Sequence, residues 1–398
     1  MVLHFIIKNF GKVESADISL DDLVIFVGNN NSGKTMVMQL IYGIRKELKK
    51  FQVSISGARH TQLNDQYLIR CDQKWFREVE SQVNEYLAEN KSRIVEDIFG
   101  IPVSCGEIRV EVEDTVNTYF VSSLSGYRNK SIGEEETRVS IDTRQYENGE
   151  NTRFLEHQVS SAGGLETAVR AALQMVWSIV LSEKNTTDGG QLFLPASRSG
   201  LQLRGSRRSL LEFGEEHLLE GKVIQKGDET FYVEKYGTRE ISLHVASSMI
   251  HELTPFIKAL SATQQIDWLY CDEVENSLHP LLQREMARWL IRMVNAGMHI
   301  IISSHSDTRA SRLNNLFMLT QLNRRKPDYK MLSDLELMEI DLLRPDRKAG
   351  VYEFRNEGQG RTVVEKKEFI SHPLMGYDFQ LFGRNLDKLY DEADRITR

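Results

Sequence analysis

The sequence contains few cysteines and prolines, no long apolar run and no excess of positive charge. Its 398 residues include 3 cysteines and 7 prolines. The cysteines are far apart, which excludes a disulfide framework and a Cys-X-X-Cys metal site and favours a reducing cytoplasm. The apolar run at the N-terminus is too short for a signal peptide, and no run reaches about 18 residues. We therefore expect a cytoplasmic protein with no membrane partner.

The overall charge disfavours one class of function. The chain has 50 basic and 57 acidic residues, which gives a net charge of −7. This balance argues against a protein that coats nucleic acid by bulk charge, although it leaves a local basic groove open. With 40% hydrophobic residues, the chain is long enough for a large core and for more than one compact domain.

Buried strands and amphipathic helices alternate along the chain. Nearly continuous apolar runs, typical of strands buried on both faces, lie at 23–27, 266–271 and 299–303. Apolar residues at helical spacing predict helices over about 35–49, 72–96, 161–184 and 280–295. Strands that are separated by helices indicate an α/β chain with a mostly parallel central sheet.

The chain divides into four parts on this interpretation. Residues 1–50 and 261–398 form the two halves of one α/β core. Residues 51–160 are an insertion with helical and β segments, and residues 161–260 are a helical lobe. The boundaries follow the changes in hydrophobic pattern along the chain.

Four shorter segments complete the predicted organisation. Residues 126–153 are polar and charged, which is typical of an exposed loop. The apolar runs 316–319 and 351–354 predict strands that finish the sheet. Residues 382–390 predict a closing helix.

A glycine-rich loop follows the first buried strand. Residues 28–35 have the sequence Gly-Asn-Asn-Asn-Ser-Gly-Lys-Thr, which matches G-X-X-X-X-G-K-[ST]. Its glycines let successive N–H groups point at phosphate oxygens, and the next helix offers its N-terminal dipole. Lys34 supplies a positive charge for the β- and γ-phosphates of ATP, and the Thr35 hydroxyl is a ligand for Mg²⁺. The predicted ATP-binding residues are Asn29, Asn30, Asn31, Ser32, Gly33, Lys34 and Thr35.

Two further strand ends carry residues with matching chemistry. Asp272 and Glu273 end the run 266–271, where Asp272 is placed to hold Mg²⁺ and Glu273 to act as general base. His305 follows the run 299–303 and is placed to reach the γ-phosphate. The alternatives, an ordinary acidic strand end and a structural histidine, remain open at this point.

The order of these motifs resembles a known group of ATPases. The phosphate loop, Asp272-Glu273, Glu275-Asn-Ser-Leu-His-Pro280 and Ser304-His305 are similar to motifs of the ABC-type AAA ATPases of the SMC, RecF and OLD (overcoming lysogenization defect) group. The same resemblance extends to the segments 9–12, 194–198 and 245–248. It implies an α/β P-loop NTPase fold, namely an ABC-ATPase-like head with a mixed β-sheet and a helical second lobe. The chain resembles a stand-alone OLD-like ATPase, without the Toprim nuclease domain that OLD nucleases append.

The resemblance also implies a head-to-head dimer. In such families each ATP is sandwiched between the phosphate loop of one subunit and a signature segment of the other. By position this segment is Ala246-Ser-Ser-Met249, in which Ser247 and Ser248 would bind ATP. A helix N-cap is the alternative role of the two serines. Met249 stands where the family usually has glycine, which argues against tight closure or fast hydrolysis.

Three functions remain open from the sequence. The first is an ATP-hydrolysing switch that dimerises on ATP and controls a separate effector, such as a nuclease, in bacterial anti-phage defence. The second is a RecF-like DNA repair ATPase, in which DNA phosphates would contact Arg198, Arg204, Arg207 and Arg208. The third is a slow ATPase that serves as the scaffold of a larger assembly. The acidic net charge favours the first.

Overall fold

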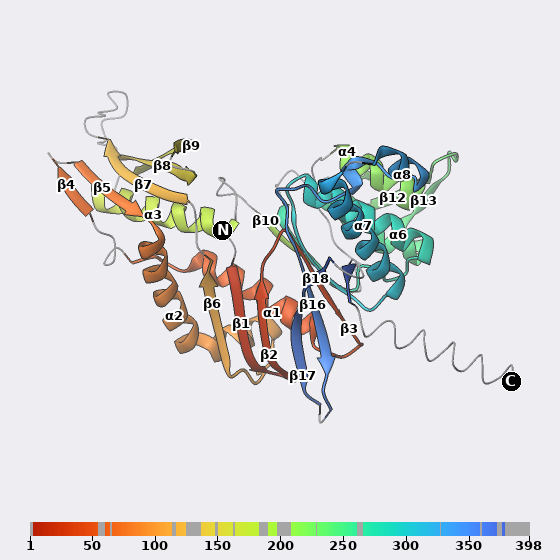
Figure 1. Ribbon diagram of the computed structural model, residues 1–398, viewed down its shortest axis with the longest axis horizontal. Helices are drawn as coiled ribbons and strands as arrows, with labels where there is room; N and C mark the ends of the chain where they lie inside the picture. Colours follow the sequence, from red (N-terminus) through yellow and green to blue (C-terminus); the bar gives the residue numbers. More distant parts are fainter. Residues whose placement is uncertain are drawn as a thin grey trace. The chain divides into compact units, whose positions relative to one another are not determined.

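The structure is a computed structural model in which the chain forms two compact units (Figure 1). The N-terminal unit comprises residues 1–11, 15–19 and 40–189, and the C-terminal unit comprises residues 12–14, 20–39 and 190–398. The residues that the structure describes are 3–54, 60–63, 66–113, 117–124, 137–147, 150–161, 164–182, 190–196, 208–227, 229–260, 266–326, 328–358, 360–371 and 376–378.

A mixed sheet forms the centre of the C-terminal unit. Its strands lie in the order β10 (Gly190–Leu194), β14 (Ile266–Cys271), β15 (His299–Ser304), β3 (Leu23–Gly28), β16 (Ala349–Asn356) and β17 (Thr362–Lys367). The first five strands are parallel, and β17 runs antiparallel to β16. Every residue of β3, β14 and β15 is buried, which explains their unbroken apolar character. The carboxyl ends of these three strands therefore meet at one edge.

Helices cover the sheet of this unit, and Figure 1 shows α4, α6, α7 and α8 gathered together. Their bounds are α4 (Arg208–Gly214), α5 (Ser248–Leu260), α6 (Pro280–Asn295), α7 (Asp307–Arg325) and α8 (Tyr329–Asp334). Short helices are η2 (Glu215–Leu219), η3 (Leu243–Val245) and η4 (Glu339–Asp341). The fully buried Trp289 of α6 packs against Phe256 of α5, and its indole N–H donates to Leu210 O over 2.8 Å. This aromatic contact fixes the helical layer.

Helix α6 shows how local sequence sets its bounds. His279 is its N-cap, and Pro280 occupies the first turn, where its missing N–H leaves no helical hydrogen bond unmade. Gly297 follows the last helical residues with φ of 90°, a conformation that glycine adopts readily. Helix α6 therefore returns the chain directly from β14 to β15.

Smaller elements complete the C-terminal unit. One antiparallel sheet contains β11 (Gly221–Lys226), β12 (Glu229–Glu234) and β13 (Glu240–Ser242). A pair of short strands contains β18 (Phe369–Ile370) and β19 (Gly376–Tyr377). Asn314 of α7 fixes β19, because its side-chain Oδ1 accepts from Tyr377 N over 2.8 Å.

The N-terminal unit contains two groups of strands and two long helices. Strands β2 (Val13–Ser19), β1 (Leu3–Phe10) and β6 (Glu107–Val112) are neighbours in that order. The antiparallel second sheet has the order β4 (His60–Leu63), β5 (Gln66–Cys71), β7 (Asn117–Leu124), β8 (Thr137–Glu147) and β9 (Glu150–Ser161). The helices are α2 (Gln73–Phe99) and α3 (Gly164–Ser182). Asn84 ties α2 to β6 by two hydrogen bonds to the backbone of Val110, of 2.8 and 2.9 Å.

Most of the predicted elements are confirmed, and three segments differ. Residues Val13–Ser19 form the additional strand β2, which the sequence pattern did not predict. Residues 126–153 were expected to be a loop, but 137–147 and 150–161 form the hairpin β8–β9. Residues 316–319 lie inside α7 and not in a strand, because a short apolar run has no period that separates a strand from a buried helix. The closing helix at 382–390 falls outside the described residues.

The stretch 161–260 is also less helical than expected. Besides α3, α4 and α5 it carries the strands β10 to β13. Within the described part of the chain, no helix is long and apolar enough to cross a membrane.

Candidate functional site

The phosphate loop connects β3 to α1 (Lys34–Lys50) and requires glycine at two positions. Gly28 has φ of 152°, and a Cβ atom there would lie 2.6 Å from Phe354 O. Gly33 has φ of 94°, and its Cβ would lie 2.8 Å from Val13 Cγ2. A side chain at either position would therefore strain the backbone and collide with a neighbour. The two glycines are therefore required by the backbone of the loop, which is not a glycine-rich turn with a lysine beside it by accident.

The ammonium group of Lys34 lies inside this loop. It donates to Gly28 O over 2.8 Å, to Asn29 O over 2.7 Å and to Ser32 Oγ over 3.3 Å. Burial lowers the pKa of Lys34, an effect that the nearby carboxylates oppose. The side chains of the three asparagines at 29–31 are exposed at the rim of the loop. The loop thus concentrates positive charge and N–H groups at one point.

Thr35 and Asp272 meet beside the loop although 237 positions separate them. The Thr35 hydroxyl donates to the two carboxylate oxygens of Asp272 over 2.9 and 2.8 Å. These hard oxygen donors fit Mg²⁺, which protein sites usually hold through one or two such ligands together with phosphate and water. The described residues include no cluster of three or more His, Cys, Asp or Glu that could hold a metal by itself.

Ser303 links Asp272 to its neighbour. The Ser303 hydroxyl donates to Asp272 Oδ1 and accepts from the backbone N–H of Glu273 over 2.8 Å. Because Ser303 ends β15 and Asp272 follows β14, this hydroxyl joins two adjacent strand ends. It therefore fixes the orientation of the Asp272 carboxylate relative to Thr35.

Glu273 and His305 lie side by side at the same edge. His305 Nδ1 is 3.8 Å from Glu273 Oε1 and 3.5 Å from Glu275 Oε1. The side chains of Glu273 and His305 are 34% and 40% exposed, so both remain accessible to solvent and ligand. This arrangement offers a carboxylate base and an imidazole next to the phosphate loop.

Five of the predicted site residues therefore converge, and two do not. Lys34, Thr35, Asp272, Glu273 and His305 lie at one edge of the sheet of the C-terminal unit. The other two, Ser247 and Ser248, are exposed at the start of α5, and no contact between described residues joins them to the phosphate loop.

Met249 follows these serines and packs against the hydrophobic core. Its side chain is therefore directed inward.

The sequence did not identify the polar partners behind these side chains. Ser303, Glu275 and Arg309 are buried and bond to the residues of the site. Only Glu275 had a signal in the sequence, because it is the last acid of the pattern Asp-Glu-X-Glu that begins at Asp272.

The end of β10 also lies against the site. Leu194 O accepts from Asp272 N over 2.9 Å, and Ala196 O accepts from Asn276 Nδ2 over 2.8 Å. Gln191 of the same strand instead accepts from the hydroxyl of Tyr270 over 3.3 Å. The segment that follows β10 is therefore the backbone neighbour of the Asp272 turn.

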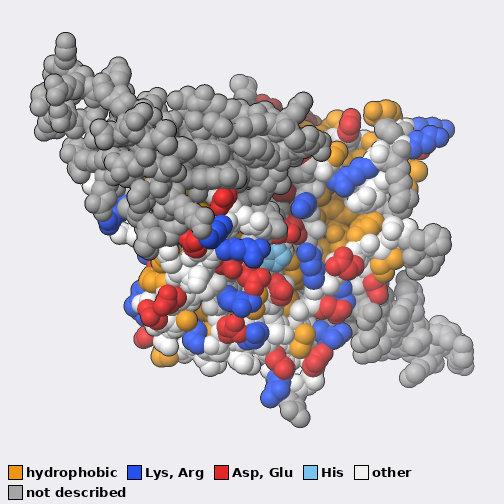
Figure 2. Space-filling model, turned by 60° about the vertical axis from the view of Figure 1, so that its left-hand side comes forward, with side chains coloured by type: hydrophobic (Ala, Val, Ile, Leu, Met, Phe, Trp, Pro, Cys, Tyr) orange, Lys and Arg blue, Asp and Glu red, His pale blue; other side chains and the backbone are white. Residues whose placement is uncertain are grey.

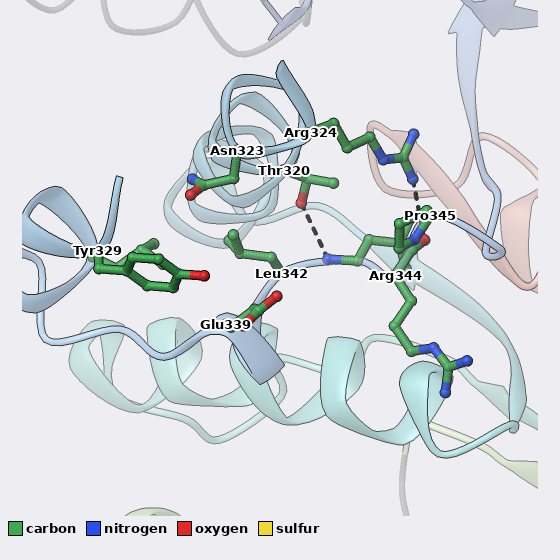
Figure 3. Close-up of a pocket in the computed structure, with 10 residues that line it drawn as sticks. Thr320, Asn323, Arg324, Tyr329, Glu339, Leu342, Arg344 and Pro345 are labelled. Atoms are coloured by element: carbon green, nitrogen blue, oxygen red, sulfur yellow. Dashed lines mark hydrogen bonds between the residues drawn. The ribbon is translucent and has the colours of Figure 1, made fainter. Parts of the chain in front are cut away.

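A separate cavity of about 140 Å³ lies at the far end of α7 (Figure 3). Thr320 Oγ1 accepts from Leu343 N over 3.1 Å at its wall, and Arg324 donates to Arg344 O over 3.1 Å. None of its lining residues belongs to the phosphate loop or to the turn 272–275. This cavity is therefore not part of the site described above.

Two family models match the chain. One is described as an AAA ATPase domain and matches residues 1–163. The other is described as an AAA domain, putative AbiEii toxin, type IV TA system, and matches residues 145–309. Together they span the phosphate loop, Asp272, Glu273 and His305. No curated protein is close enough to count as a relative.

Among solved structures, the chain is similar to SMC head domains. The head domain from Thermotoga maritima is 11% identical with a TM-score of 0.36, over 92% of this chain and 99% of that one. An Smc head bound to the C-winged helix domain of ScpA is 10% identical with a TM-score of 0.41, over 92% and 96%. A third, bound to the C-terminal domain of ScpA derived from Pyrococcus furiosus, is 10% identical with a TM-score of 0.36, over 100% and 99%.

Proposed function

We propose that the chain, which two AAA ATPase family models match over residues 1–163 and 145–309, is an ABC-like ATPase of the SMC, RecF and OLD type. In this proposal it hydrolyses Mg²⁺-bound ATP at the site described above and uses the cycle as a switch for a separate effector. The proposal rests on one observation: the Thr35 hydroxyl is hydrogen-bonded to the Asp272 carboxylate, next to Lys34 of the phosphate loop. No purely structural need explains a loop lysine, a helix-start threonine and a strand-end carboxylate in this arrangement.

In this proposal each residue has one task. Lys34 exchanges its loop carbonyls for the β- and γ-phosphate oxygens of ATP. Thr35 and Asp272 hold Mg²⁺, which when bound neutralises charge that develops on the phosphates. Glu273 orients the attacking water and accepts its proton. His305 contacts the γ-phosphate from the neighbouring strand end.

The exposed start of α5 supports a dimer. Val245 is 77% exposed, and Ser247 and Ser248 are exposed beside it. In a two-fold dimer this segment of one protomer would meet the phosphate loop of its partner and close over ATP. Met249 packs against the core, so its side chain is not part of the exposed surface that Val245, Ser247 and Ser248 present. This geometry favours the signature role of the segment despite the missing glycine.

A place in bacterial defence is the favoured context. One matching family model is named for a putative toxin of a type IV TA system, which favours a chain that acts with a second protein. Of the arginines that a RecF-like DNA-binding role would use, Arg198, Arg204 and Arg207 lie outside the described residues. On the coloured part of the face in Figure 2, Lys and Arg side chains are interspersed with Asp and Glu. A continuous basic groove is the feature that DNA binding would favour.

The test combines nucleotide binding, turnover and oligomeric state. Glu273→Gln should bind Mg²⁺-ATP as the wild type does, hydrolyse it about 10²- to 10⁴-fold more slowly, and accumulate as a dimer in light scattering. Lys34→Ala should lose ATP binding. The matched control is Glu229→Gln, an exposed residue at the start of β12, which should behave as the wild type. Unchanged ATP uptake by Lys34→Ala, or unchanged turnover by Glu273→Gln, would refute the proposal.

A further inference from the structure

Behind His305 lies a buried ion pair that no step of the proposed reaction uses. The Glu275 side chain is 4% exposed, and that of Arg309 is fully buried. Arg309 Nη1 lies 2.8 Å from Glu275 Oε2, and Arg309 Nη2 donates to Ser303 O over 3.3 Å. An ion pair that is removed from water this completely needs further hydrogen bonds to repay its desolvation.

The second carboxylate oxygen of Glu275 supplies those bonds. Glu275 Oε1 accepts from Ser304 Oγ over 2.8 Å, from His305 N over 2.7 Å and from Ser306 N over 3.1 Å. Three donors of the turn after β15 therefore converge on one oxygen atom of the turn after β14. Burial alone would raise the pKa of Glu275, but Arg309 and the His305 N–H lower it more, so the group stays ionised.

The turn that carries Glu273 is strained and requires such an anchor. Glu273 has φ of 44° and Ser277 has φ of 60°, both left-handed conformations that non-glycine residues seldom adopt. Conformations of this kind persist where the surroundings over-determine them. Here Glu275 lies between the two strained residues, and its buried carboxylate is bonded to the turn that follows β15.

The geometry points to Glu275 and Arg309 as a positioning pair that holds the strand end bearing Glu273 in register with the strand end bearing His305. The inference rests on the proposed function, since it concerns how the base and the histidine of that site are aligned. Neither member of the pair needs to touch ATP. Their effect reaches the reaction through the backbone of His305 and the turn 273–277.

Two variants test the pair, and a third serves as a matched control. Glu275→Gln keeps the shape of the side chain but removes its charge. Arg309→Lys keeps the charge but cannot reach Glu275 and Ser303 together. The control is Asp341→Asn, which breaks another buried ion pair of the same unit, between Asp341 and the arginines of α6.

The first measurement separates binding from turnover. For Glu275→Gln we expect ATP affinity close to that of the wild type and kcat lower by about 100-fold, because a displacement of about 1 Å is enough for such a loss. Arg309→Lys should show a smaller loss of kcat with the same unchanged affinity. Asp341→Asn should lose a similar amount of thermal stability and keep its kcat at 25 °C.

The second measurement needs no turnover. The imidazole resonances of ¹³C-histidine-labelled protein report the surroundings of His305, whose signal His305→Gln assigns. We expect this signal to shift in Glu275→Gln and to stay in place in Asp341→Asn. A wild type that neither binds nor hydrolyses ATP would refute the proposed function, while the resonance still decides whether Glu275 positions His305.

Other outcomes overturn the inference. If Glu275→Gln and Asp341→Asn lose kcat equally at equal loss of stability, the pair is merely structural. The same conclusion follows if the His305 resonance is unmoved in Glu275→Gln. If circular dichroism shows that neither Glu275→Gln nor Arg309→Lys folds, the pair serves folding and not positioning.

Discussion

Asp341 stabilises the helical layer of the C-terminal unit, and its replacement has a calculable effect. Its side chain is fully buried, with Oδ1 2.6 Å from Arg292 Nε and Oδ2 3.1 Å from Arg288 Nη2. Met338 N donates to the same carboxylate over 2.9 Å. Asp341→Asn keeps the volume but removes the charge. Arg288 then keeps its contact with Glu285, 2.6 Å away, and Arg292 keeps its contact with the ring of Phe213, so both nearly buried guanidinium groups lose the carboxylate between them.

The size of the effect follows from the burial. Removing one partner of a buried pair costs about 3–5 kcal/mol. For a unit of this size about 2–4 °C of melting temperature corresponds to each kcal/mol, so the loss is on the order of 6–20 °C. Differential scanning fluorimetry measures it. A melting temperature within about 2 °C of the wild type would refute the reasoning, since it would mean that the arginines find other partners at no cost.

The pH dependence of this effect has a definite sign. Burial raises the pKa of Asp341, but Arg292 and the N–H of Met338 lower it more, so the folded pKa lies below the ordinary value. A carboxyl group with a depressed folded pKa stabilises the protein fully above its unfolded pKa, and this contribution is lost as the pH falls through the folded pKa. The stability difference between wild type and Asp341→Asn should therefore be constant near neutral pH and shrink below about pH 4. A difference that grew on acidification would contradict the assignment.

Three further substitutions test other contacts. Gly28→Ala places a Cβ 2.6 Å from Phe354 O, so we expect a loss of about 1–3 kcal/mol of stability in chemical unfolding, together with weaker ATP binding in calorimetry. Ser303→Ala removes the hydroxyl that orients Asp272, so the half-saturating Mg²⁺ concentration for turnover should rise about 10- to 100-fold; an unchanged Mg²⁺ titration would oppose this role. Val245→Glu places a charge on the exposed residue directly before the signature segment, so ATP-dependent dimers should vanish in light scattering while ATP affinity is kept. Dimers that persist would remove this surface from the interface.

The sequence predicted those parts of the site that follow from chain order. The loop at 28–35 lies directly after a buried strand, and Asp272 follows another, so parallel pairing alone brings them to one edge. The glycines, the lysine and the threonine are also fixed by local chemistry. Lys34, Thr35 and Asp272 could therefore be placed together before the fold was known.

Contacts that depend on side-chain packing could not be predicted in this way. Glu275 lies in the turn after β14 and Arg309 in the first turn of α7, and no short-range pattern encodes that these two side chains meet. The run 316–319 was assigned to a strand because its residues are all apolar, yet they pack inside a helix that is buried on several sides. Strand β2 alternates only partly between buried and exposed positions, which left its pattern too weak to identify.

The bonds that Lys34 makes within its own loop affect which anions can bind there. The ammonium group already donates hydrogen bonds to three oxygen atoms of the loop. An anion that binds there must therefore replace these hydrogen bonds with its own. A single small anion can replace only some of them, whereas a polyphosphate chain presents several oxygens at once and also meets the N–H groups of the loop. We therefore expect inorganic phosphate and chloride to compete poorly for the loop, although both are abundant in any cell.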